Sequence, residues 1–125
     1  MSVVSHLRIA EDVRIEAEAF HLLQSSLGRD ASESVVERVV VEIAEKLGEA
    51  ERAHAIADHD ALTRTARALG AISEQLGFRL LAQVAQDLRH CTARRDAAAL
   101  AAVLGRLLRV GDASLAAAIE NGDFS

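Results

Sequence analysis

The stretch from Leu62 to Gly77 constrains the fold most strongly, because it combines a regular apolar stripe with a residue that ends helices. Apolar and small side chains recur there at steps of three and four residues, which places them on one face of an α-helix. Gly77 follows the last of them, and glycine is the residue most often found just beyond a helix C-terminus. We therefore predict a helix whose core-facing side is made by Leu62, Ala66, Leu69, Ile72, Ser73 and Leu76.

The opposite face of this predicted helix mixes charge with small side chains. It carries two arginines, one glutamate and two small residues, so bare backbone lies between charged groups. A partner surface can approach such backbone closely. We predict that this face binds a partner through Arg64, Arg67, Gly70, Ala71 and Glu74.

The composition favours a single all-α domain. The chain has 125 residues, half of them hydrophobic, but no proline, tryptophan or tyrosine and only three phenylalanines. Leucine, valine, isoleucine and alanine must therefore fill the core, which is typical of closely packed helices. A chain of this length buries about two-thirds of the surface that its unfolded form exposes, which is enough for one core.

Further helical patterns flank the central stretch. They cover about residues 9–26, 32–57 and 78–93, and a last one begins at Asp96. We expect Asp60 to cap the central helix, and Gly111 with Asp112 to interrupt the last one. Since the connections are short, consecutive helices must run antiparallel. The chain is therefore predicted to be one domain, residues 1–125, built as an antiparallel four-helix bundle over about residues 32–120 with an extra N-terminal helix at one end.

The same period assigns inward-facing residues to the flanking helices. These are Ile9, Val13, Ala17, Phe20 and Leu23 or Gln24 in the first; Val36, Val40, Ile43, Leu47, Ala50 and His54 in the second; Phe78, Leu81, Val84, Ala85, Leu88 and Thr92 in the fourth; and Leu100, Val103, Leu104, Leu107 and Leu108 in the fifth. Three more valines, Val35, Val39 and Val41, widen the apolar face of the second helix. This surplus surface either buries the first helix or pairs two copies of the chain as a homodimer.

The charge distribution argues against nucleic acid as a partner. The net charge is −6 over residues 1–58 and +1 over residues 59–125, which gives −5 for the chain. Nucleic acids are bound by basic faces that release counterions, and no basic cluster exists here. The single Cys91 fits a reducing compartment. No apolar run reaches the roughly 20 residues that span a bilayer, and Glu11 and Asp12 come too early for a signal peptide, so we expect a cytoplasmic protein that binds no membrane.

The central stretch resembles the phosphorylation helix of histidine-containing phosphotransfer (HPt) domains. The motif of that family is His-x-Leu-Lys-Gly, followed by Leu-Gly or Ile-Gly ten residues after the histidine. Leu69 fills the leucine position and Leu76-Gly77 the closing pair. Arg67 stands at the histidine position, Gly70 at the lysine position and Ala71 at the glycine position. The turns at residues 27–30, 58–60 and 95–96 also match the family's turns, so the resemblance extends over nearly the whole chain.

The resemblance implies the HPt fold but not HPt chemistry, because the phosphate acceptor is missing. The function that it implies is a two-component signalling protein that binds a response-regulator receiver or a sensor kinase. Such a protein modulates a phosphorelay without carrying phosphate, and we expect no catalytic residue and no cofactor. Within that reading Arg67 is an anchor for an acidic receiver pocket, since a guanidinium offers a planar fork of donors that stays charged.

Three alternatives come from the residues themselves. An active phosphotransfer protein could use a non-motif histidine, namely His54, His59 or His90, although no histidine here has a lysine three residues later. A helical dimerisation module unrelated to signalling is the second alternative. A metal site is the third, because two Glu-x-x-His pairs occur at Glu18 and Glu51. Such pairs bind metals in di-iron bundles, but helices three to five offer no acid at a core position to complete a site, so we expect no metal.

Overall fold

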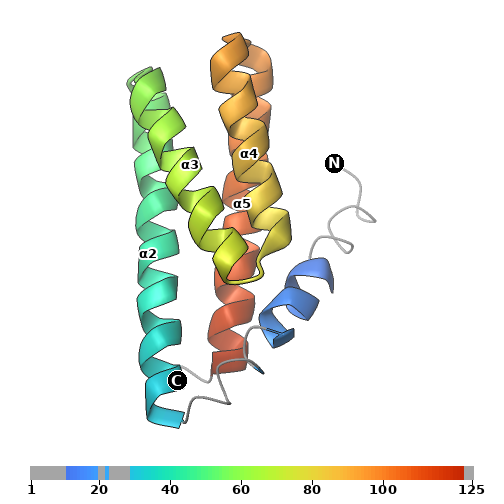
Figure 1. The fold of residues 1–125 in the computed structure, drawn as a ribbon. Helices are drawn as coiled ribbons and strands as arrows, with labels where there is room; N and C mark the ends of the chain where they lie inside the picture. The colour runs from blue at the N-terminus through green and yellow to red at the C-terminus, as the bar shows by residue number, and fades with distance from the viewer. Residues whose placement is uncertain (1–10, 20–21, 23–28, 123–125) are drawn as a thin grey trace.

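Every element that the structure describes is an α-helix (Figure 1). The computed structural model describes residues 11–19, 22 and 29–122. Its four long helices are α2 (Arg29–Ala55), α3 (His59–Gln75), α4 (Arg79–Arg94) and α5 (Ala97–Gly122). Residues 11–19 form a further helical stretch. The all-α prediction is confirmed for this part of the chain.

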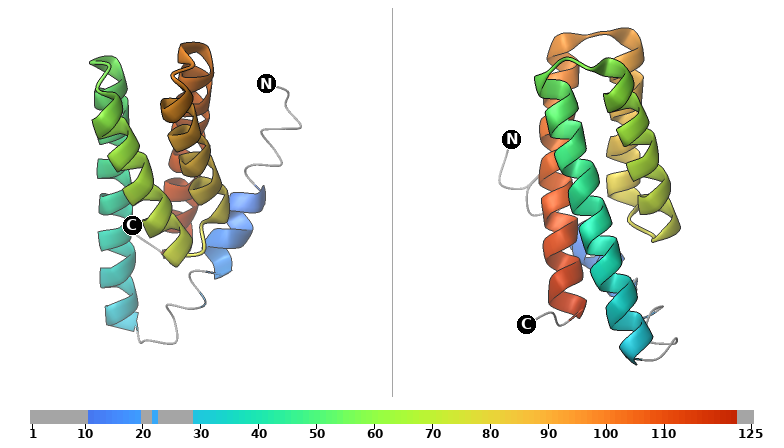
Figure 2. Two further views of the ribbon diagram at one scale, coloured as in Figure 1. Left: turned by 45° about the horizontal axis from the view of Figure 1, so that its top comes forward. Right: turned by 90° about the vertical axis from the view of Figure 1, so that its left-hand side faces the viewer.

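The four long helices pack in a ring around one core. Helix α3 packs against α2 and α4, and α5 packs against the same two helices from the other side. Consecutive helices run antiparallel, as the two views in Figure 2 show. None of the helices in the described ranges is long and apolar enough to cross a membrane.

The predicted inner faces of α3 and α4 are confirmed. On α3, Leu62, Ala66, Leu69 and Ser73 are buried, while Ile72 and Leu76 are half-buried against the core. On α4 all six predicted positions are buried: Phe78, Leu81, Val84, Ala85, Leu88 and Thr92. These two helices therefore present complete apolar stripes to each other and to the rest of the bundle.

The inner face of α2 is rotated relative to its prediction. Val39 is buried and Val40 only half-buried, and Ala53 is buried where the sequence predicts His54. Ile43, Leu47 and Ala50 are core residues as predicted. The consecutive valines Val39, Val40 and Val41 misplace the centre of the stripe, because all three positions are apolar. The side chains of Val35 and Val36 lie outside the described residues, and Val41 is 51% exposed.

The cap of α3 is Asp58, so the prediction of Asp60 is wrong. The backbone N–H of Ala61 donates to Asp58 Oδ1 over 3.0 Å. Asp60 falls in the first turn, where a carboxylate also complements the positive end of the helix dipole. Both acids suit a helix start, and the sequence does not separate them.

The predicted end of α3 at Gly77 is confirmed. Gly77 has a φ of +82°, a left-handed conformation that glycine adopts at little cost. The next residue, Phe78, donates its backbone N–H to the Ser73 carbonyl over 2.8 Å, which closes the helix end as a Schellman motif. Asp96 likewise caps α5 as predicted, since it accepts the backbone N–H of Ala99 at 3.1 Å.

Gly111 does not interrupt α5, so that prediction is wrong. The helix continues through it to Gly122. Gly111 is buried against α2, and a Cβ built there would come within 2.5 Å of Leu47 Cδ1. The glycine therefore provides space for a neighbouring side chain and does not end the helix.

Replacing Gly111 by alanine tests this packing. We expect Gly111→Ala to destabilise the fold by about 1–3 kcal/mol, because Leu47 must leave its position. Gly105→Ala is the matched control on the same helix, since its Cβ would meet only the end of the Arg109 side chain at 3.4 Å. That control should be neutral or stabilising by up to about 1 kcal/mol, the helix propensity difference between the two residues. Urea unfolding measures both, and equal effects at the two sites would contradict the packing argument.

Residues 11–19 pack into the core and form a hydrogen bond to the N-terminus of α4. Val13 and Ala17 are buried in the core. Between them, Glu16 accepts the backbone N–H of Leu80 at 3.1 Å through Oε1. The N-cap residue of α4, Phe78, makes no capping bond with its own side chain, so Glu16 supplies one from a distant part of the chain. The predicted inner positions Ile9, Phe20 and Leu23 lie outside the described residues.

Burial raises the pKa of the Glu16 carboxyl above its ordinary value of 4.5, against the backbone N–H groups of Leu80 and Arg79, which lower it. Its Oε2 atom is buried without a hydrogen-bond partner. Because the folded pKa is raised, the protonated form favours folding. That contribution is full below pH 4.5 and is lost as pH rises through the folded pKa.

Glu16→Gln should therefore remove part of the pH dependence of stability. The amide keeps an oxygen for the Leu80 N–H and carries no charge, so the variant should gain stability relative to the parent chain as pH rises from 4 to 7. Urea unfolding across that range measures the difference. Glu18→Gln, an exposed carboxylate on the same stretch, is the control and should show no such trend. A pH-independent difference for Glu16→Gln would contradict the assignment.

Candidate functional site

Helices α3 and α4 approach each other closely because small residues line their contact. A Cβ built on Gly70 would lie 3.6 Å from the Ala85 Cβ and 3.9 Å from the Ala82 carbonyl oxygen. Gly70 is thus half-buried and faces α4, which corrects the prediction that it exposes bare backbone outward. Because Gly70 has no side chain, it leaves space between the two helices.

A hollow of about 240 Å³ lies along this contact. We call it the α3/α4 hollow, and its lining residues are Ala66, Arg67, Gly70, Ala71, Glu74, Ala82, Gln86 and Arg89. Four of the five residues predicted to bind a partner are therefore brought together here. Arg67, Ala71 and Glu74 are exposed at its edge.

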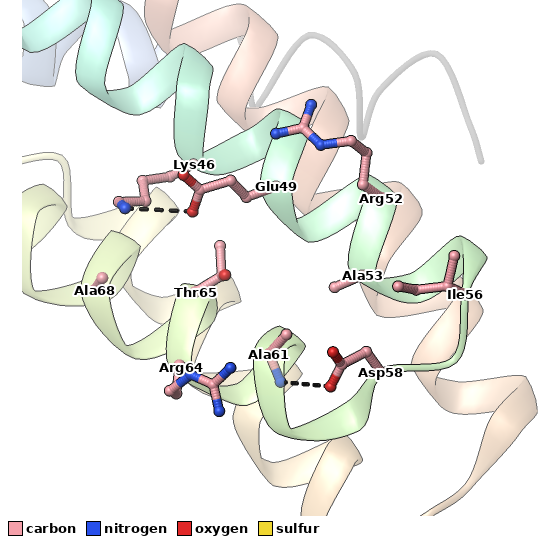
Figure 3. A pocket seen from close by; sticks show the side chains of 10 residues that line it. All are labelled: Lys46, Glu49, Arg52, Ala53, Ile56, Asp58, Ala61, Arg64, Thr65 and Ala68. Carbon is pink, nitrogen blue, oxygen red and sulfur yellow. Dashed lines mark hydrogen bonds and ion pairs between the residues drawn. The ribbon is translucent and has the colours of Figure 1, made fainter.

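Arg64 is the one predicted residue that lies elsewhere. It lines a second hollow of about 530 Å³ between α2 and α3 (Figure 3). Figure 3 shows Arg64 extending from α3 with its guanidinium away from the pair formed by Lys46 and Glu49. One helical turn from Arg67, it reinforces the positive charge of α3 but does not share the α3/α4 hollow.

The charges of the α2/α3 hollow are largely used within the fold. Lys46 and Glu49 form an ion pair at 3.3 Å, and Asp58 accepts the capping bond of α3. Thr65 is buried at the floor, and Ile56 is 75% exposed at the rim. This hollow is broader than the α3/α4 hollow but presents fewer unused polar groups.

The sequence prediction misses the contribution of α4. Gln86 and Arg89 line the α3/α4 hollow together with Ala82. Their spacing of three and four residues along α4 marks them as one outer stripe, which is a signal that the sequence does contain. What the sequence does not contain is the register that sets this stripe beside Arg67.

The candidate phosphohistidines do not line the α3/α4 hollow. His54 is half-buried on α2, His59 is the exposed first residue of α3, and His90 is exposed on α4. Of the two Glu-x-x-His pairs, His21 lies outside the described residues, and Glu51 is exposed one turn before His54. No group of three or more His, Cys, Asp or Glu side chains that could hold a metal occurs in the part of the chain that the structure describes.

The guanidinium groups of Arg67 and Arg89 and the amide of Gln86 give the α3/α4 hollow several hydrogen-bond donors. Guanidinium groups and the Gln86 amide donate hydrogen bonds, but neither is a nucleophile at neutral pH. The floor of the hollow includes Gly70 and Ala82. No protein-family model, no curated protein and no solved structure matches this chain.

Proposed function

We propose that this chain is an HPt-like protein of a two-component system that has no phosphate acceptor and acts by binding. Its partner is a response-regulator receiver or a sensor kinase, and the contact is made by the outer face of α3 together with the α3/α4 hollow. By occupying its partner, the protein modulates a phosphorelay in the cytoplasm without taking the phosphoryl group.

The fold supports this proposal. An HPt domain is an antiparallel four-helix bundle whose phosphorylation helix presents one exposed residue to the partner. Helices α2 to α5 pack as an antiparallel ring, and α3 ends at Gly77 as the motif requires. Arg67, ten residues before that glycine, is exposed near the middle of α3.

The proposal rests mainly on the environment of Arg67. At the position of the motif histidine the chain presents an exposed guanidinium beside a hollow with a floor of small residues. An acidic surface such as the phosphoacceptor pocket of a receiver matches this charge. A guanidinium accepts no phosphoryl group, so we expect the two proteins to bind without phosphoryl transfer.

Reversing the charge of Arg67 tests the interface. Arg67→Glu should weaken binding to a cognate receiver or kinase by about 2–5 kcal/mol, because attraction becomes repulsion at the centre of the contact. Stability should change by no more than about 0.5 kcal/mol, since the position is exposed and away from helix ends. Isothermal titration calorimetry against purified receiver and kinase domains from the same genome measures the first quantity, and urea unfolding the second.

Arg109→Glu is the matched control, an exposed arginine on α5, which does not pack against α3. It should leave binding within about twofold. Incubation with the cognate kinase and labelled ATP tests the other half of the proposal. An acid-labile label on His54, His59 or His90 would show the protein to be a phosphotransferase, and binding unaffected by Arg67→Glu would place the interface elsewhere.

A further inference from the structure

The register between α3 and α4 is fixed by two contacts. Near one end the Thr63 hydroxyl donates to the Thr92 hydroxyl over 2.8 Å. Two turns further along α3, Gly70 lies against Ala85. Because the helices are antiparallel, each step forward on α3 is matched by an equal step back on α4.

Arg67 and Arg89 lie between these two contacts, at nearly the same level of the two helices. Arg67 follows Thr63 by four residues and precedes Gly70 by three; Arg89 precedes Thr92 by three and follows Ala85 by four. Both side chains line the α3/α4 hollow, as the register requires. Two positively charged side chains thus line one hollow.

Neither arginine is neutralised within the described residues. The ion pairs found there join Lys46 to Glu49 and Arg106 to Asp87. Glu74 lines the same hollow without forming an ion pair with either arginine. In addition, the Nε atom of Arg89 is buried and has no hydrogen-bond partner.

This arrangement is unfavourable unless an anion joins it. Like charges in one hollow repel, and a buried donor without an acceptor loses the bond that water would give it. An oxyanion placed between the two guanidiniums removes both costs, because each guanidinium presents parallel N–H donors that match two oxygens. The Gln86 amide adds a neutral donor on the same side.

We propose that Arg67, Arg89 and Gln86 form a receptor for an oxyanion, and that the group bound is a side-chain carboxylate of an acidic protein partner. This rests on the proposed function for the source of the carboxylate. Charge decides against a phosphate dianion: two arginines and Glu74 leave the hollow with a net charge of +1, which one carboxylate balances. The small residues Gly70 and Ala82 at the floor, with Ala71 at the edge, let a partner backbone come near enough to insert an aspartate or glutamate.

The test is titration of the full chain with a capped tri-aspartate peptide, followed by NMR. The Arg89 side-chain Nε–Hε signal and the Gly70 amide signal should shift saturably. The tri-asparagine peptide and potassium chloride at equal ionic strength should not shift them in this way. Arg67→Gln and Arg89→Gln should each weaken the binding of the peptide by about tenfold or more, which is the effect expected from the loss of one charge-assisted hydrogen bond. Arg109→Gln is the control and should leave the affinity within twofold.

Arg89→Lys is the second variant. Arg89 is half-buried, so the smaller side chain of glutamine changes the local packing as well as the charge, and lysine separates the two effects. It keeps the charge without the planar fork, so the peptide should still bind, several-fold more weakly. The receptor is overturned if no saturable shift occurs, or if Arg89→Gln and Arg89→Lys bind the peptide as the parent chain does. Tighter binding of inorganic phosphate than of the peptide would overturn the choice of a carboxylate.

The outcomes separate this inference from the proposed function. If Arg67→Glu abolishes receiver or kinase binding while Arg89→Gln changes neither that binding nor peptide binding, the receptor is wrong and the proposed function stands. If the peptide binds through both arginines but no receiver or kinase binds, the proposed function fails and the hollow still recognises carboxylates.

Discussion

The close approach of α3 to α4 is the constraint on which the candidate site depends. Glycine and alanine at the contact bring the two helices together, and the Thr63–Thr92 hydrogen bond fixes their relative height. A larger side chain at Gly70 would fill the floor of the hollow, and a shift of one turn would separate Arg67 from Arg89. The candidate site is therefore a consequence of helix packing, and no single helix contains it.

Much of the bundle is readable from the sequence, and the errors have physical causes. The stripes of α3 and α4 contain one clear period each, and the residues predicted to face inward are buried or half-buried. Thr65 and Cys91 are buried as well, without having been predicted. The stripe of α2 is blurred by consecutive valines, so its centre is misplaced. Gly111 has two uses in a helix, ending it or making room, and only the position of Leu47 on another helix shows that it makes room. The choice between Asp58 and Asp60 as a cap likewise depends on backbone geometry that neighbouring acids do not reveal.

The candidate site, like the fold, could be predicted only in part from the sequence. Arg67, Ala71 and Glu74 were recognisable as candidates, because they share the outer face of one helix. Gly70 lines the hollow because it faces α4, which the sequence of α3 alone does not show. Arg89 and Gln86 belong to another helix, and their relation to Arg67 depends on the register of the antiparallel pair. Glu16 is a stronger case, since its hydrogen bond to Leu80 joins positions 64 residues apart. A helix with no side-chain cap of its own is a hint that a remote group supplies one, but the sequence does not name that group.

The proposed function follows from the chemical difference between the guanidinium of Arg67 and the imidazole of the HPt motif. An imidazole with a free nitrogen can attack a phosphoryl group and release it again, because it gains and loses a proton near neutral pH. A guanidinium remains charged under all physiological conditions and has no free lone pair for such an attack. Arg89 lines the same hollow, so the described residues around it include two fixed positive charges and no histidine. Under the proposed function, the α3/α4 hollow holds a carboxylate of the partner at the place where an HPt domain presents its nucleophile.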